Sequence, residues 1–223
     1  MKSVLIASLA IAASSSFGQI NVPGTSDLWL AGAPNGTTAS YEDKAPDQSP
    51  VLVAGITAGT RYSFSVTGSV SNIPYPSGLT PDGAGVYGHA TGAENGISNL
   101  AAPLNSLIGV FVASSVPVTP GSSLTFSGSG LNFLSLSPTL NQSFFIGDGL
   151  NDLAQSQSFF APAGATRLYL GTMDGYGWDN NSGSFTVEIR ASAPSGAVPE
   201  PSTYGAIAGL SLLGLAFLRR RKS

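Results

Sequence analysis

The sequence predicts an all-β fold: a β-sandwich or jelly roll of about eight short strands, flanked by an N-terminal signal peptide and a C-terminal membrane helix. Three observations favour it. The 223 residues include 28 glycines and 15 prolines but only 9 % charged residues, which is typical of short strands joined by many turns. The apolar runs in the middle of the chain are short, and some alternate with polar residues. That part of the chain shows no amphipathic-helix pattern.

The N-terminus has the pattern of a signal peptide. A basic residue follows Met1, the segment 4–13 is apolar, and small residues come next. Ser16 and Gly18 fit the −3 and −1 positions of a cleavage site, so we expect residues 1–18 to be removed. The apolar run is too short to span a bilayer.

The expected β-domain covers residues 19–190, and a linker of small residues follows at 191–198. Within residues 60–67, Tyr62, Phe64 and Val66 alternate with polar residues and should share one buried face. The region 71–100 lacks periodicity and is expected to be a long loop, and 114–143 is a stretch rich in Ser, Pro and Gly. Strands are expected at 27–30, 51–56, 60–67, 107–112, 144–149, 158–161, 167–171 and 185–189.

Charge and cysteine content narrow the possible partners. Between residues 19 and 198 the chain carries eleven acidic side chains against four basic ones. This excess of acid argues against a nucleic-acid partner and is compatible with cation binding. There is no cysteine, which excludes disulfides and thiolate sites, and a single histidine disfavours zinc.

The same inventory argues against an enzyme. Nucleophilic catalysis by serine needs a histidine and an orienting acid, but the only histidine, His89, lies in a glycine-rich region, and no Gly-x-Ser-x-Gly motif is present. Two of the eleven carboxylates could form a glycoside hydrolase site, which remains a remote alternative. We therefore expect a non-enzymatic protein.

One loop concentrates oxygen ligands. Within residues 173–185, Asp174, Asp179, Asn180 and Asn181 lie among three glycines, directly before the last expected strand. Carboxylate and amide oxygens are the ligands that Ca²⁺ takes in flexible geometry. The alternative is a polar hairpin turn, because Gly, Asn and Asp favour turns for conformational reasons alone.

The C-terminus is tripartite: a Pro-Glu-Pro motif, an apolar segment at 204–218 and a basic end. The apolar segment has fifteen apolar or small residues, fewer than the ~20 of a comfortable membrane helix, and the basic cluster should stay cytoplasmic. The motif residues are Pro199, Glu200, Pro201, Arg219, Arg220 and Arg221.

Residues 199–223 resemble the PEP-CTERM sorting signal of Gram-negative bacteria. The resemblance implies export, anchoring in the membrane, processing near the motif by an exosortase, and a destination at the cell surface or in the extracellular matrix. It implies nothing about the chemistry of the middle of the chain.

The middle resembles the PA-IL-like family of calcium-dependent galactophilic lectins and related galactose-binding-like domains. The segment 180–185, Asn-Asn-Ser-Gly-Ser-Phe, carries most of this resemblance. Strand-and-turn patterns at 51–55, 104–109, 159–162 and 168–171 carry the rest. The resemblance implies a β-sandwich that binds Ca²⁺ and, through the ion, a carbohydrate such as extracellular polysaccharide.

Carried over by position, the resemblance implies a set of oxygen ligands. Asp179 is a further candidate because the loop is one residue shorter here than in the family. The implied set is the Asp174 carboxylate, the carbonyl of Gly177 or Trp178, the amides of Asn180 and Asn181, and a carbonyl near Asn72 or Tyr75.

The sugar contacts carry over less well. The family's His-Pro-Asp-Gln stretch has no counterpart here, which leaves Asp82, His89 and Asn95 as substitutes. Tyr176 and Trp178 are candidates to stack on a pyranose ring, or else to pack against their own loop. The alternative function is a structural cell-surface or matrix protein without a ligand.

Overall fold

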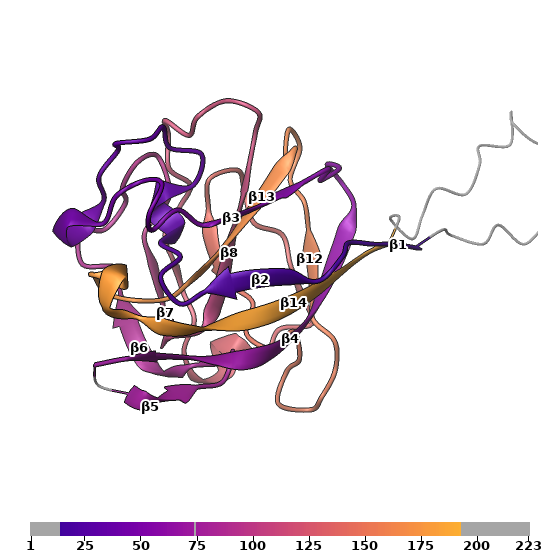
Figure 1. The fold of residues 1–223 in the computed structure, drawn as a ribbon. Helices are drawn as coiled ribbons and strands as arrows, with labels where there is room; N and C mark the ends of the chain where they lie inside the picture. The colour runs from indigo at the N-terminus through magenta and orange to yellow at the C-terminus, as the bar shows by residue number, and fades with distance from the viewer. Residues whose placement is uncertain (1–13, 74, 193–223) are drawn as a thin grey trace, which may run out of the picture. The chain divides into compact units, whose positions relative to one another are not determined.

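The computed structural model describes residues 14–73 and 75–192. This part of the chain is mostly β, with fourteen strands in three sheets, four short 3-10 helices and no α-helix (Figure 1). The expectation of a β-rich chain is confirmed, but the expected number of about eight strands is too low.

The first sheet has seven strands, and the long strands β4 (Arg61–Asn72) and β14 (Ser182–Ser192) lie side by side at its centre. Its main path runs β1-β14-β4-β12-β10, while β2 also pairs with β14 and β5 also pairs with β4. The other members are β1 (Ser14–Ser16), β2 (Ile20–Pro23), β5 (Tyr75–Leu79), β10 (Ser135–Leu136) and β12 (Ser158–Phe160).

The second sheet has four strands in the order β11-β8-β13-β3, and the third has three in the order β6-β7-β9. The second consists of β3 (Val51–Ala54), β8 (Leu107–Val112), β11 (Ser143–Phe145) and β13 (Arg167–Thr172). The third consists of β6 (Ala84–Gly88), β7 (Leu100–Leu104) and β9 (Leu124–Thr125). The 3-10 helices are η1 (Leu28–Leu30), η2 (Ser40–Glu42), η3 (Gly128–Leu131) and η4 (Trp178–Asn180).

Side-chain alternation explains the central pair of strands. Along β4 the predicted set Tyr62, Phe64 and Val66 is buried, while intervening residues face outward. In the antiparallel register, Val66 lies opposite Val187 of β14, and Phe64 lies opposite Ile189. Both strands therefore turn one apolar face to the core.

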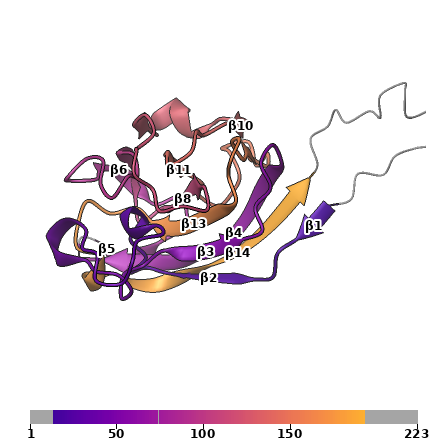
Figure 2. The ribbon, with the colours of Figure 1, turned by 90° about the horizontal axis from the view of Figure 1, so that it is seen from above.

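Side chains from the first and second sheets share one hydrophobic core. Tyr62 lies 6.1 Å from Phe111 of β8 between ring centroids, and Phe159 of β12 lies 5.4 Å from Phe144 of β11. Figure 2 shows β8 and β13 above the plane of β4 and β14. Burial of these large rings is the main stabilising contribution that the fold offers.

Three regions differ from the expectation. The region 71–100 is not a structureless loop, because it contains β5, β6 and the first residue of β7, and 114–143 contains β9, η3 and β10. Residues 28–30 form η1 rather than a strand, with the Asp27 carboxylate accepting the Trp29 amide at 2.8 Å as its N-cap.

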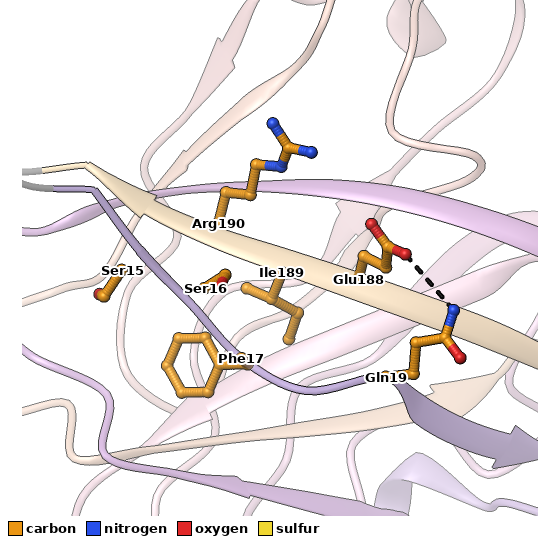
Figure 3. Close-up of a pocket in the computed structure, with 7 residues that line it drawn as sticks. All are labelled: Ser15, Ser16, Phe17, Gln19, Glu188, Ile189 and Arg190. Atoms are coloured by element: carbon orange, nitrogen blue, oxygen red, sulfur yellow. Dashed lines mark hydrogen bonds between the residues drawn. The ribbon is translucent and has the colours of Figure 1, made fainter.

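The N-terminal part of the domain overlaps the predicted signal peptide. β1 pairs with the last residues of β14, and the Phe17 amide donates to the Ile189 carbonyl at 3.1 Å. A cavity of about 420 Å³ lies there, and Figure 3 shows the side chains that line it. The expected cleavage before Gln19 would remove β1, Phe17 and other lining residues of this cavity, so we do not treat it as a candidate site.

The remaining terminal segments are not part of the description. Residues 1–13 of the predicted signal peptide, residues 193–198 of the predicted linker, the sorting motif and the predicted membrane segment lie outside the described residues. The first two residues of the predicted linker, 191 and 192, belong to β14 instead, so the strand runs past the expected end of the domain at residue 190. Among the residues that are described, none belongs to a helix long and apolar enough to cross a membrane.

Candidate functional site

A pocket of about 210 Å³ lies where the end of β4 meets the loop between β13 and β14. This is the end of the sheets opposite β1 (Figure 1). Three of the predicted ligand residues, Asn72, Asp174 and Asn180, line this pocket, and we call it the Asn72–Asp174–Asn180 pocket. For Asn72, the expected ligand is a backbone carbonyl near this position rather than the side chain. Its other lining residues are Ile73, Tyr87, Leu104, Gly175 and Tyr176.

A chain of side-chain hydrogen bonds holds Asp174 in place. Its Oδ1 accepts the Gly175 amide at 2.6 Å, and its Oδ2 accepts Nδ2 of Asn72 at 3.3 Å. The Oδ1 of Asn72 in turn accepts Nδ2 of Asn105 at 3.3 Å, and the Asn105 amide donates to the Met173 carbonyl at 2.7 Å. The carboxylate is therefore buried and oriented by neutral amides rather than by a basic side chain.

Several buried side-chain oxygens in the described part of the chain have no hydrogen-bond partner. Within the described residues they include Oδ2 of Asp27, Oδ1 of Asn105, Oγ of Ser106 and Oδ1 of Asn181. Asn105 and Ser106 exchange backbone hydrogen bonds with Met173, and Asp27 pairs with Thr172. Buried polar atoms almost always find a partner, so these atoms are exceptions, but none of the four residues lines the Asn72–Asp174–Asn180 pocket.

The loop between β13 and β14 is fixed at its far end by Asp43. The Asp43 carboxylate accepts the Trp178 amide at 3.0 Å and the Asp179 amide at 3.3 Å, so it caps the N-terminus of η4. Burial raises the pKa of Asp43, and these two hydrogen bonds oppose that rise. The protein therefore supplies its own anion to hold this loop.

Three of the predicted ligands lie outside the pocket lining. Asp179 is exposed, and the Gly177 carbonyl accepts the Asn180 amide at 3.4 Å. Asn181 is buried and points its Nδ2 to the Gly24 carbonyl at 3.2 Å. No group of three or more His, Cys, Asp or Glu side chains within the described ranges could hold a metal. A cation at this pocket therefore depends on one carboxylate together with amide or carbonyl oxygens.

Backbone packing explains why a glycine stands at position 183, within the Asn-Asn-Ser-Gly-Ser-Phe segment. Gly183 has φ of +81°, and a Cβ there would lie 2.3 Å from the Ser69 carbonyl of β4. Only glycine allows β14 to approach β4 so closely directly after the loop.

The expectation that Trp178 stacks on a sugar is wrong. Trp178 is 0 % exposed, its Nε1 donates to the Thr172 carbonyl at 2.9 Å, and its ring lies 5.6 Å from that of Trp29. Tyr176, two residues earlier, is 54 % exposed and lines the pocket. Of the two predicted aromatic residues, only Tyr176 can meet a ligand.

Asp82 and His89 do not reach the pocket either. Asp82 accepts the Asp148 amide at 3.0 Å and lines another cavity, of about 200 Å³, together with Asp148 and Asp152. Burial raises the pKa of Asp82. His89 is buried with its ring stacked on Trp29 at 3.7 Å between centroids, so its predicted role in sugar binding is not supported.

His89 belongs instead to a polar cluster that sequence reasoning missed. Its Nδ1 donates to the Gly92 carbonyl at 2.7 Å, and its Nε2 lies 2.8 Å from the Ser40 hydroxyl. The Ser40 hydroxyl also contacts Glu94 Oε2 and Thr91 Oγ1, each at 2.8 Å. Burial lowers the pKa of His89, and the Gly92 hydrogen bond and the Glu94 charge oppose that effect.

This cluster joins a serine to a histidine, but its geometry is structural. Ser40 and His89 are both buried, and a carbonyl rather than a carboxylate orients the imidazole. Glu94 binds the hydroxyl itself, which a catalytic triad does not do. The cluster therefore fastens the segment around Ser40 to the segment 89–94.

Comparison with known proteins identifies a family motif in one part of the chain. Residues 197–222 match the PEP-CTERM protein-sorting motif. No curated protein and no solved structure matches the chain. Nothing in these comparisons supports the resemblance to PA-IL-like lectins. The chain thus carries a PEP-CTERM sorting motif at its C-terminus, which implies an exported protein that an exosortase processes and sorts to the cell surface.

Proposed function

We propose that the exported β-domain is a non-enzymatic binding module that holds Ca²⁺ in the Asn72–Asp174–Asn180 pocket and, through the ion, hydroxyl groups of a carbohydrate. The observation that carries this proposal is that three residues with oxygen-bearing side chains, one from β4 and two from the segment before β14, line one pocket. The PEP-CTERM motif supports it, because a surface-sorted protein meets extracellular calcium and polysaccharide.

The donor set fits calcium better than a transition metal. Ca²⁺ takes six to eight oxygen ligands and accepts carboxylate, amide and carbonyl oxygens together with water or a hydroxyl group. Asp174 would supply the carboxylate and Asn180 an amide oxygen, while Asn72 orients the Asp174 carboxylate. The bound ion would leave coordination positions for sugar hydroxyls.

The presence of a single carboxylate, that of Asp174, also determines the Ca²⁺ affinity that we expect. Calcium sites become weaker as the number of charged ligands falls, and extracellular modules typically bind with a Kd of roughly 10⁻⁴–10⁻³ M. We expect this site to lie in that range, because Asp174 is the only carboxylate that lines the pocket among the described residues. Calcium in the surroundings of the cell surface would then keep it partly occupied.

Isothermal calorimetry of the purified exported protein with CaCl₂ tests this proposal. The expected result is saturable binding that Asp174→Asn abolishes and Asp179→Asn preserves, because Asp179 lies on the same loop outside the pocket lining. Wild-type protein that shows no saturable heat would overturn the calcium site and leave a structural surface protein as the better account.

A further inference from the structure

We propose that Tyr41 and Tyr176 form an aromatic platform beside the Asn72–Asp174–Asn180 pocket, so that the site takes an oligosaccharide chain rather than a single sugar. The two rings lie 4.4 Å apart between centroids at an angle of 32°. Tyr176 also lines the pocket, so the platform continues from the pocket onto the surface. This inference rests on the proposed function and names its substrate class.

The pair is exposed, which is unusual for the large aromatic side chains of this domain. Tyr41 is 65 % and Tyr176 54 % exposed, whereas Trp29, Tyr62 and Trp178 are buried completely or almost completely. A contact between two tyrosines that both remain open to solvent leaves ring surface available for a partner. The hydroxyl groups of the tyrosines and their apolar faces suit a ligand that is polar at its edge and apolar on its face.

The polar pocket next to the two tyrosines indicates that a carbohydrate chain binds to the platform. A sugar ring has the same two-sided character, with hydroxyl groups at its rim and C–H groups on its face. The pocket offers Asp174 and Asn180 for hydroxyl groups, directly or through an ion, and Tyr176 marks the boundary between this polar floor and the platform. A chain with one sugar in the pocket therefore places its next ring over the tyrosines.

The backbone is strained where it presents Tyr41. Tyr41 has φ of +56° and Glu42 has φ of +76°, a left-handed conformation that residues other than glycine rarely adopt. Such strain persists only when surrounding contacts enforce it, and it is concentrated at functional sites.

Both flanks of this dipeptide are fixed by contacts with other loops. On one side, the Ser40 amide and hydroxyl bind Glu94, and the hydroxyl binds His89. On the other side, Asp43 caps η4 in the loop that carries Tyr176. The two tyrosines are therefore placed by the same bonds before any ligand arrives, and a preorganised surface loses less entropy on binding.

A glycan microarray tests the platform, with the same terminal sugar printed alone and at the end of longer chains, in calcium and in a chelator. The variants are Tyr41→Ala and Tyr176→Ala, the ring-retaining Tyr41→Phe and Tyr176→Phe, and Leu153→Ala as an exposed apolar control remote in sequence. Affinities of array hits are then measured by calorimetry. Thermal unfolding confirms that each variant is folded.

We expect both alanine variants to bind the longer chains about tenfold more weakly. Tyr41→Ala should keep its single-sugar and calcium affinities to within about twofold, whereas Tyr176→Ala should also weaken single-sugar binding, because Tyr176 lines the pocket. The phenylalanine variants and Leu153→Ala should bind like wild type. Alanine variants that bind longer chains as well as wild type does would overturn the platform. Analytical ultracentrifugation tests whether the tyrosines bind a second copy of the chain instead. Alanine variants that lose self-association but keep their glycan binding would also overturn the platform.

The outcomes also separate this inference from the proposed function. Calcium binding by wild type without any bound glycan would overturn the platform and leave the cation site standing. Tyrosine-dependent binding of longer chains without calcium would support the platform and overturn the cation site. Failure of both calcium and glycan binding would overturn both.

Discussion

The carboxylate of Asp43 accepts the backbone amide of Trp178 at 3.0 Å, across 135 positions of sequence. This bond joins the segment that presents Tyr41 to the loop that carries Asp174 and Tyr176. Two separate loops thereby become one preformed surface at the end of the sheets.

Removal of that bond should loosen the surface. We expect Asp43→Ala to lower the free energy of unfolding by about 1 kcal/mol, within the range of about 0.5–2 kcal/mol for loss of a capping side chain. Asp47→Ala, an exposed acid in the same segment, should change it by less than about 0.5 kcal/mol. Urea denaturation of both variants measures the difference, and equal stabilities would contradict the capping role.

Trp178 and Tyr176 should respond in opposite ways to truncation, although they lie two residues apart. Trp178→Ala removes a completely buried ring and should cost about 3–5 kcal/mol of unfolding free energy. Tyr176→Ala removes a half-exposed ring and should cost less than about 0.5 kcal/mol. Chemical denaturation measures both values. A mild loss for Trp178→Ala would restore Trp178 as a candidate for sugar contact.

Stability should fall as pH rises because of Asp27. Burial, reinforced by the charges of nearby acids, raises the pKa of Asp27 well above its usual value, although the Trp29 amide bond lowers it. The folded state thus holds a proton that the unfolded state releases above about pH 4, so the unfolding free energy declines from there until pH exceeds the raised pKa.

Asp27→Asn should remove this decline, since asparagine keeps an oxygen for the Trp29 amide and carries no charge to bury. Urea denaturation at several pH values between about 4 and 7 compares the slopes of wild type, Asp27→Asn and the exposed control Asp47→Asn. The same slope in wild type and Asp27→Asn would contradict the assignment.

His89 offers a separate pH signal, because it is the only histidine and its NMR resonance needs no assignment. Burial lowers the pKa of His89, so we expect its ring to titrate below about 6.5. The unfolded state then takes up a proton that the folded state refuses, and stability falls as pH drops below that value. Glu94→Gln removes a charge that raises this pKa and should lower it further. A pKa at or above 6.5 in wild type would refute the buried environment.

Local patterns predict the strands that carry their own periodicity. β4 and β14 alternate cleanly along the chain, and the structure buries the expected faces. β5 and β6 both contain glycine, β5 also contains proline, and both expose much of their surface, so no pattern marks them. They are strands because β4 and β7 pair with them, and that tertiary contact has no local signature.

In the candidate site, too, some features can be predicted from local sequence and others depend on tertiary contacts. Asp174 and Asn180 stand out in one loop, and both line one pocket, while the oxygen site itself stays a prediction. The inward turn of Trp178 is not visible in the sequence, because the loop has no period that assigns its faces. The Ser40–His89 pair joins residues 49 positions apart, which no motif spacing indicates.

The calcium site is the central claim, and a crystal structure of the protein grown with CaCl₂ tests it most directly. The anomalous difference map should show one peak in the Asn72–Asp174–Asn180 pocket, about 2.3–2.6 Å from an Asp174 carboxylate oxygen. The peak should be absent from crystals of Asp174→Asn grown in the same way. An empty pocket in the wild-type map, or a peak only at the Asp82–Asp148–Asp152 cavity, would contradict the account.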